Sequence, residues 1–432
     1  MKCPAIPIIV LIVVGASALA AEKTTISESV TIKHYNFSKV DKDAQMWSGL
    51  YVGSNGKVYI GLCTHGDAAN VYEFDPKKEK MRHLANITKL AGERGKGIWT
   101  TGKIHVQMQE LDGYVYFGTL DEDNGPPVID ASSYSGPHWY RIQMETGRVE
   151  QLALVSDFWG LVGQAMDKKR RIIYGLAEDG HLYRYFIDEN YTEDMGRVDN
   201  WDICRTIFID DEGNVYGSLS PGMVWKYDVS QDRIFDLQFL KLPQNGQSRT
   251  MANPMLDRLG QWRVIEWEPD EQVAYGIVGG SNMLFRFDPA AGREGEIRLL
   301  EPMYAPMYRD AEPFDIPGAT LAMTISLSEK KIYYIPVASG DFDYGAVSTG
   351  GDSPPLSYMV SYDLKTGKRE NLGILKTKQG RLAYGMGAAQ ADAEGRIWFV
   401  GAFEEPNEEY VARMMRGKFP YSMGLGVYDP RR

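Results

Sequence analysis

A short apolar phrase of β-branched and aromatic residues recurs seven times along this chain, each time directly after a polar turn. A second phrase, in which polar and aromatic positions alternate, follows each apolar one. The seven apolar phrases begin at Lys57, Tyr114, Arg171, Asn214, Gln272, Lys331 and Arg396. Short strands repeated in this way, with Gly and Asp in the turns between them, are typical of β-propeller blades. The pattern therefore predicts an all-β fold, a seven-bladed β-propeller.

Each blade is expected to run outward from a central axis as four strands, A to D, with the apolar phrase as strand B and the alternating phrase as strand C. The last blade provides strands A, B and C at 384–391, 396–401 and 421–428, and then the chain stops. An unassigned alternating strand at 29–33 can supply the missing strand D. Closing the ring in this way removes the exposed edges of an open array. Two long connections, 338–356 and 404–418, are expected to be functional loops or flaps.

The first residues of the 432-residue chain differ from the rest. Lys2 precedes an apolar stretch from Ile6 to Ala20, and Ala18-Leu-Ala20 is a cleavage pattern. Residues 1–21 are therefore predicted to be a secretory signal peptide, and the protein is predicted to be secreted or periplasmic. Because the repeat continues to the end, residues 22–432 are expected to form one propeller domain. The two remaining cysteines, Cys63 and Cys204, fall in opposite blades, so two buried thiols are favoured over a disulfide.

Charge and motifs narrow the range of partners. The formal net charge is −11 and the chain has no run of Lys or Arg, which argues against nucleic acid as a partner. An anionic ligand would need a local cluster of positive groups. The usual signatures of zinc proteases, P-loop proteins, serine hydrolases and dithiol redox proteins are absent. No cofactor is required, although the acidic loops at 121–123 and 341–343 could hold Ca²⁺ through oxygen ligands or be solvated.

The histidines are not spread evenly over the predicted disc. Strand direction alternates within a blade, so the starts of A strands and the connections between strands B and C share one face. His105 starts an A strand, His65 follows a B strand, and His138 and His181 start C strands. The other two, at 34 and 83, fall on outer D strands. Four of the six histidines are therefore expected on the face where propellers usually place a site.

A shared register adds two arginines to this group. Counted back from each A–B turn, His105, Arg205 and Arg263 occupy equivalent positions in blades two, four and five. In the other four blades the equivalent residues are small or apolar: Ser48, Val162, Ala322 and Gly387. Equal register means equal height around the axis, so an imidazole and two guanidinium groups are predicted to meet at one channel mouth. The alternative is structural, with the histidines bonded to neighbouring blades and the arginines paired to acidic residues such as Asp202, Asp210 and Glu266.

Several phrases of the first half of the chain resemble secreted seven-bladed propeller polysaccharide lyases, closest to the L-rhamnose-α-1,4-D-glucuronate lyase group, with ulvan lyases more distant. The resemblance is strongest over 47–230, in phrases such as Cys63-Thr-His-Gly66, Gly102-Lys-Ile-His105, Gly136-Pro-His-Trp-Tyr-Arg141 and Asn200-Trp-Asp-Ile-Cys-Arg205. It implies a catalytic histidine at the channel mouth, matched here by His105 with His65 as second choice. It also implies an arginine that holds the sugar, matched by Arg205.

The chemistry of such a lyase agrees with these residue types. β-Elimination from a 4-linked uronide removes the C5 proton, and cations on the carboxylate stabilise the enolate-like transition state. A neutral imidazole can act as general base, and a second His or a Tyr can protonate the leaving oxygen. Aromatic residues such as Trp99, Trp139, Trp159 and Trp201 could stack on sugar faces or belong to the core. The expected partner is therefore a uronic-acid polysaccharide or oligosaccharide.

Two other functions remain open. A rhamnosidase-type hydrolase on the same scaffold would need a pair of carboxylates or a base with a water, and no carboxylate occupies the shared A-strand register. A non-catalytic glycan- or protein-binding propeller would have an aromatic rim without converging His and Arg.

Overall fold

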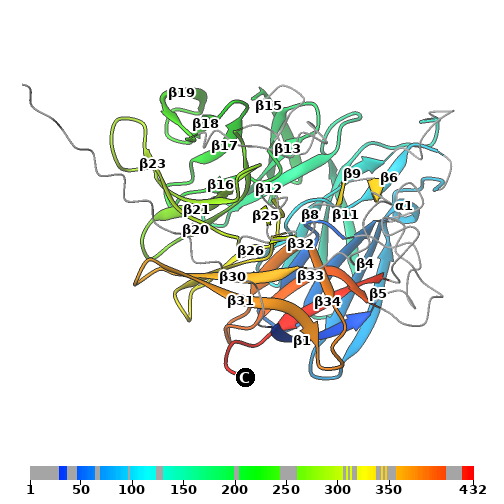
Figure 1. Cartoon of the computed structure of the whole chain (residues 1–432). Coiled ribbons are helices and arrows are strands. Elements are labelled where there is room, and N and C mark those ends of the chain that lie inside the picture. Colours follow the sequence, from blue (N-terminus) through cyan, green and yellow to red (C-terminus); the bar gives the residue numbers. More distant parts are fainter. Residues whose placement is uncertain are drawn as a thin grey trace, which may run out of the picture.

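The computed structural model describes residues 29–36, 46–63, 69–95, 98–122, 130–198, 204–243, 260–304, 319–336, 357–404 and 421–432, together with four two-residue strands. Almost all of the regular structure is β-strand, and the strands form antiparallel sheets that follow one another in chain order, from the blue first blade to the orange last blade in Figure 1. The prediction of an all-β propeller is confirmed.

Seven four-stranded units can be traced in the described part of the chain, and the strands of each follow in order from the axis outward. Blade one consists of β2 (Leu50–Val52), β3 (Val58–Cys63), β4 (Ala69–Asp75) and β5 (Lys80–Asn86), and blade two of β7 (Gln109–Leu111), β8 (Tyr114–Gly118), β10 (His138–Gln143) and β11 (Val149–Leu154). Blade three consists of β12 (Leu161–Asp167), β13 (Ile172–Ala177), β14 (His181–Phe186) and β15 (Tyr191–Arg197), and blade four of β16 (Phe208–Ile209), β17 (Val215–Leu219), β18 (Met223–Asp228) and β19 (Arg233–Lys241). Blade five consists of β20 (Trp262–Glu268), β21 (Val273–Val278), β22 (Met283–Asp288) and β23 (Glu296–Pro302). Blade six consists of β26 (Met323–Ser326), β27 (Lys331–Tyr334), β30 (Tyr358–Asp363) and β31 (Lys368–Thr377), and blade seven of β32 (Ala383–Ala391), β33 (Ile397–Glu404), β34 (Tyr421–Tyr428) and β1 (Ser29–Asn36).

The remaining elements are short. A single helical turn, α1 (Ile87–Leu90), follows β5. Three two-stranded sheets accompany the blades: β6 (Thr100–Lys103) with β9 (Leu120–Glu122), β24 (Tyr308–Arg309) with β25 (Glu312–Pro313), and β28 (Phe342–Asp343) with β29 (Ala346–Val347).

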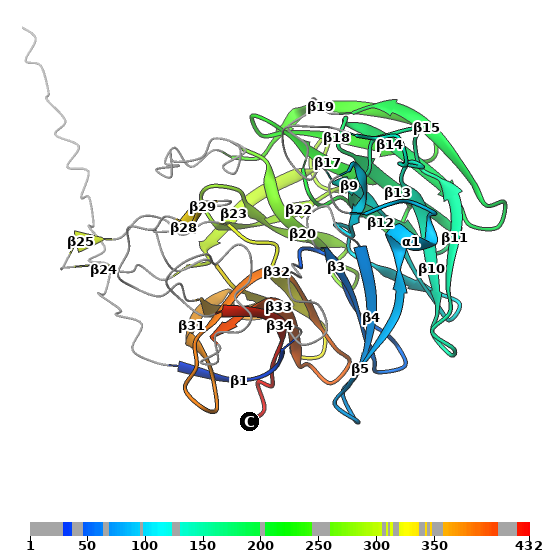
Figure 2. The ribbon, with the colours of Figure 1, turned by 90° about the vertical axis from the view of Figure 1, so that its right-hand side faces the viewer.

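The N-terminal strand closes the last blade, as the sequence predicted. The second half of β1 pairs antiparallel with β34, with Lys33 opposite Val427, and so forms the outermost strand of blade seven (Figure 2). Its first half runs parallel to β31 of blade six, with Ser29 opposite Ile374. A single strand therefore joins the last two blades into one eight-stranded sheet.

The burial of each strand explains the phrase that the chain repeats. Strand B of a blade lies between two other strands and is covered on both faces by neighbouring blades, so all six residues of β3 and of β21 are buried. The outer strands face solvent on one side, and accordingly none of the seven residues of β5 is fully buried. Continuous apolar runs in strand B and polar runs in strand D are what this arrangement requires.

Every A–B turn contains a residue with positive φ, which explains the Gly and Asp content of the turns. Glycine holds this position in four blades, for example Gly113 at φ +77°. In the other three blades it is held by Arg171, Gln272 and Lys330, at φ of 54–59°. Glycine adopts this conformation without steric cost, so the turns without glycine are the more strained ones.

The glycine that closes the repeated phrase of strand B lets the next blade pack closely. A Cβ atom on Gly61 would lie 2.7 Å from Cβ of Ile104, and one on Gly118 would lie 2.3 Å from Cδ1 of Leu161. Neither approach is possible for a real side chain. These glycines therefore fix the segment that enters the following blade, and in blade two this segment carries His105.

Blade two departs from the expected layout at this point. His105 was predicted to start an A strand, but the chain before it forms β6, which pairs with β9 instead of with the blade. The innermost strand of blade two begins only at Gln109, and the short innermost strands of blades one and four likewise begin after the register position, at Leu50 and Phe208. His105 lies in the connection between β6 and β7.

Other predictions fall outside the described residues or are confirmed. Both Cys63 and Cys204 are buried thiols that form no disulfide, as expected. The predicted signal peptide, 1–21, and almost all of the two long connections lie outside the described residues. Within the described ranges, no helix has the length and apolar character needed to cross a membrane.

Candidate functional site at the axial channel

His105 lies near the axis, where blades one, two and three meet. Its Nδ1 is 3.3 Å from the carbonyl oxygen of Val162, at the equivalent position of the next blade. Its ring is nearly parallel to the indole of Trp47 of blade one, with 6.2 Å between ring centroids. The residue is only 7% exposed. Contacts to both neighbouring blades fix the imidazole in one orientation.

The surroundings of His105 keep its imidazole neutral. Burial lowers the pKa of His105 well below the usual histidine value, and the positive charges of Arg205, Lys103 and Arg263 lower it further. Only the carbonyl of Val162 acts in the opposite direction. Charges from blades two, four and five therefore act on one ring. The predicted register thus brings His105, Arg205 and Arg263 into electrostatic contact.

The two arginines are held differently. Arg205 precedes the short strand β16, and its backbone oxygen would lie 3.3 Å from a Cβ atom on Gly163, so blade three packs closely against it. Arg263 belongs to β20 and lies close enough to Tyr334 of blade six to influence the pKa of that phenol. Its Nε is buried and has no hydrogen-bond partner. Because a buried guanidinium N–H without an acceptor is costly, this group is suited to an anionic ligand.

Lys103, which was not among the predicted site residues, belongs to the same cluster. Lys103 lies on the segment that leads to His105, and its Nζ is 5.9 Å from the centroid of the Trp47 ring. The phrase Gly102-Lys-Ile-His105 contains both residues two positions apart, and that alternation could have shown that they share a side of the chain. We call Lys103, His105, Arg205 and Arg263 the cationic cluster.

The other predicted histidines do not join this cluster. His138 and His181 start C strands, two strands away from the axis. Nδ1 of His138 lies 2.8 Å from its local carbonyl at Gly136, and burial lowers the pKa of His138. Nδ1 of His181 lies 3.0 Å from the Asp194 carboxylate of the adjacent outer strand. Both have partners within their own blades.

Two further predicted residues, His65 and Trp201, lie outside the described residues. Of the other aromatic candidates, Trp139 is fully buried in the core and donates from Nε1 to the Thr192 hydroxyl. Trp99 and Trp159 are half-buried and both pack on the ring of Phe158. Among these candidates only that pair remains partly open to a sugar.

The acidic loops give no metal site within the described residues. Asp121 is buried and accepts a hydrogen bond from the Gly160 backbone at 2.7 Å, so it holds a loop. No group of three or more His, Cys, Asp or Glu side chains gathers anywhere in the part of the chain that the structure describes. The residues of the second loop, 341–343, lie wholly or in their side chains outside it.

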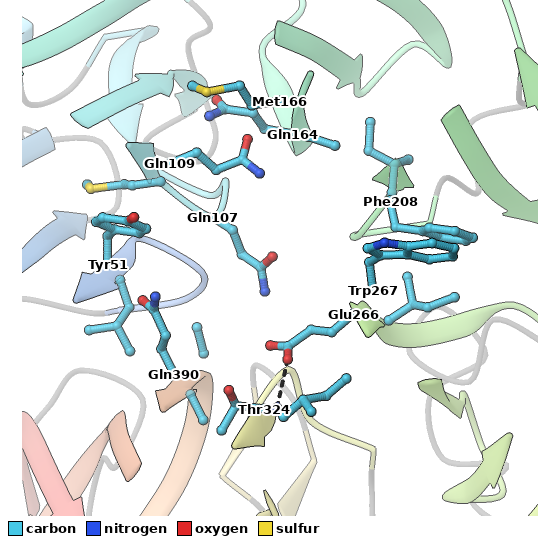
Figure 3. Close-up of a pocket in the computed structure, with 18 of the residues that line it drawn as sticks. Tyr51, Gln107, Gln109, Gln164, Met166, Phe208, Glu266, Trp267, Thr324 and Gln390 are labelled. Atoms are coloured by element: carbon cyan, nitrogen blue, oxygen red, sulfur yellow. Dashed lines mark hydrogen bonds between the residues drawn. The ribbon is translucent and has the colours of Figure 1, made fainter. Parts of the chain in front are cut away.

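A cavity of about 360 Å³ occupies the channel directly beyond the cationic cluster. The inner strands of all seven blades contribute to its wall, and Figure 3 shows their side chains around the open centre. Gln107 and Gln109, which follow His105 at intervals of two residues, bring carboxamides to it. Glu266, Thr324 and Gln390 add further polar groups, facing the apolar residues Leu50, Ile207, Ile265, Ala388 and Ala389.

Glu266 is the one acidic residue in the described wall of this cavity. Its Oε2 accepts a hydrogen bond from the Ile325 backbone N–H at 2.8 Å. Burial raises the pKa of Glu266 to about 8, although the bonds from Ile325 and the Thr324 hydroxyl oppose the shift. From the sequence, Glu266 was named only as one possible acidic partner for the arginines under the structural alternative. Its position between apolar residues of an inner strand was the signal that it faces the channel.

Comparison with known proteins supports the fold and nothing finer. No protein-family model matches the chain, and no curated protein matches it. Among solved structures, the RRP9 WD40 repeats superpose with a TM-score of 0.54 at 9% identity, covering 92% of this chain and 99% of that one. The U3-55K structure gives a TM-score of 0.53 at 9% identity, covering 89% and 95%. The chain is therefore similar in fold to WD40-type β-propellers.

Proposed function

We propose that the protein is a secreted polysaccharide lyase that cleaves a rhamnose–glucuronate or related uronide linkage by β-elimination. The observation that carries the proposal is the cationic cluster around His105, in a protein whose net charge is −11. A local concentration of positive groups against an acidic background favours an anionic ligand. A neutral imidazole at its centre favours proton abstraction from that ligand.

His105 has the properties of a general base. Its low pKa keeps the ring unprotonated at neutral pH, and a base must be unprotonated to accept a proton. When Nδ1–H donates to the carbonyl of Val162, the basic lone pair is on Nε2. A fixed partner on one ring nitrogen selects the tautomer in the same way in other histidine sites.

Arg205 and Arg263 are assigned to the uronate carboxylate. A guanidinium binds a carboxylate through two parallel hydrogen bonds. Neutralising the carboxylate acidifies the adjacent C5–H bond, because the developing enolate charge is then stabilised. The unpartnered Nε of Arg263 supplies one donor for this purpose.

The reaction is balanced without a co-reactant. Nε2 of His105 takes the C5 proton, and the C5–H electrons form the C4–C5 double bond as the C4–O4 bond breaks. The leaving oxygen takes a proton from an acid. His138 starts a C strand and is bonded within its own blade, which leaves His65, by resemblance, or a Tyr as the candidate. The products are an unsaturated uronide and a new chain end.

The small exposure of His105 favours a second candidate, a non-catalytic propeller that binds uronic-acid glycans. An imidazole that is 7% exposed and in contact with Val162 and Trp47 can also serve to join blades. In that case Arg205 and Arg263 would bind the glycan without chemistry.

Product analysis separates these functions. Purified protein is incubated with gum arabic and with ulvan, and ultraviolet absorbance of unsaturated uronide is followed together with free rhamnose. New absorbance accompanied by a new reducing end supports the lyase. Rhamnose without absorbance indicates hydrolysis, and binding without either product indicates the glycan-binding propeller.

A further inference from the structure

The channel cavity contains polar groups that the cationic cluster does not use. The Oε1 atom of Gln109 is buried and has no hydrogen-bond partner. Gln107 and Glu266 approach each other across the open centre from opposite walls in Figure 3. By contrast, Gln164 and Gln390 bind backbone groups of their neighbours, Gly118 and Val52, so their role is structural. Polar groups that converge on an apolar-walled cavity of this size are characteristic of a small-molecule site.

The cavity is accessible from the face that bears the A–B turns. Leu327, part of the cavity wall, is 47% exposed, and it follows strand β26 on the turn side. The cationic cluster lies at the other ends of the same inner strands. A ligand that entered from the turn side would not pass His105.

The charges around the cavity select a neutral ligand. Its described wall contains no Lys or Arg to bind an anion. A cation would meet the charges of Lys103, Arg205 and Arg263 one layer away along the channel. A hydroxyl group suits both remaining features, because it can donate to Gln109 Oε1 and can also accept from a carboxyl group.

The apolar part of the wall suits a ring. Trp267 belongs to the wall and is half-buried. Its ring is held by stacking on the buried Phe208, with 5.9 Å between ring centroids. Apolar C–H faces of sugars pack on such aromatic surfaces while their hydroxyl groups reach polar side chains.

We propose that this channel cavity binds a neutral, polyhydroxylated molecule of monosaccharide size through Gln107, Gln109 and the Glu266 carboxyl. The site is separate from the cationic cluster and does not depend on β-elimination there. A neutral sugar lacks the carboxylate that Arg205 is proposed to hold, so binding here can be measured whether or not the protein is a lyase.

The test is isothermal titration calorimetry of the full mature chain with D-glucose and L-rhamnose as neutral probes and D-glucuronate as the anionic one. The proposal expects at least one neutral probe to bind, and to bind more tightly than D-glucuronate. Gln107→Trp removes a hydrogen-bonding group and fills the space that the ligand would occupy. It should therefore weaken binding by at least about tenfold. Glu189→Gln, at an exposed turn position of blade three that is not part of the cavity wall, is the matched control and should bind within about twofold of the parent.

Circular dichroism verifies that each variant is folded, and Gln107→Ala, which adds no bulk, replaces Gln107→Trp if the larger residue prevents folding. Absence of heat with both neutral probes would mean that the cavity holds solvent only and would overturn the proposal. Binding that survives every Gln107 change, or that favours D-glucuronate, would overturn it as well.

Discussion

Glu266 makes the stability of this propeller depend on pH in an unusual direction. Its folded-state pKa is raised from 4.5 to about 8 by burial. The folded protein therefore holds the proton over a pH range in which the unfolded chain has released it. Stability must fall as pH rises from about 4.5 to about 8, with a slope of about 1.4 kcal/mol per pH unit.

Glu266→Gln removes this titration while keeping the size of the side chain and an acceptor for Ile325. The variant should gain stability relative to the parent as pH rises, up to on the order of 4 kcal/mol near pH 8. The carboxyl borders a cavity in which water can screen it, so this total is an upper bound.

Urea denaturation of parent and variant at several pH values between about 5 and 8 measures the difference directly. Groups that titrate alike in both proteins cancel, and Glu189→Gln, at an exposed position in a turn of blade three, controls for the change in net charge. A difference between parent and Glu266→Gln that stays constant with pH, or that shrinks as pH rises, would refute the assignment of a protonated Glu266 in the channel.

Three further predictions concern the cationic cluster. Replacing His105 by Ala is expected to lower kcat on a uronide substrate by about 10²–10⁴-fold, the usual contribution of a general base, without abolishing the fold; a near-normal rate in folded protein would exclude His105 as the base. Arg205→Gln removes a positive charge that depresses the pKa of His105, so the acid limb of kcat/KM should move to higher pH, whereas an unmoved limb contradicts their coupling. Gly61→Ala would place a methyl group 2.7 Å from Cβ of Ile104. Because Ile104 precedes His105, the change should lower both the free energy of unfolding, by about 1–3 kcal/mol, and the activity. If both values are unchanged, this contact does not position the site.

Much of the fold could be predicted because each blade repeats the same physical requirements. A strand B that is covered on both faces must be apolar throughout, as in β3 and β21, and a tight A–B turn needs a residue with positive φ. The closing strand β1 could be found because the last blade lacked a fourth strand. These are local signals that the sequence carries directly.

The candidate site was predictable only in part. The shared register grouped His105 with Arg205 and Arg263, and in the structure both guanidinium charges lie near enough to lower the pKa of the imidazole. His105 lies before its expected strand, in the connection that follows β6. No periodicity in the sequence indicates that β6 pairs with β9. His138 and His181 shared the right face, but face alone does not give distance from the axis, and both bind within their own blades.

The channel cavity was missed for a similar reason. Gln107, Gln109 and Glu266 are ordinary polar residues in separate blades, and only closure of the ring brings them together. A pattern read within one blade cannot reveal a site to which all seven contribute.

The most direct measurement of the central claim is a proton NMR spectrum of a rhamnose–glucuronate oligosaccharide during incubation with the protein. The account predicts that the uronate H5 signal disappears and a vinylic H4 signal grows at the same rate, with Arg205→Ala slowing both. Rhamnose released while H5 remains intact, or an unchanged substrate in the presence of folded protein, would contradict it.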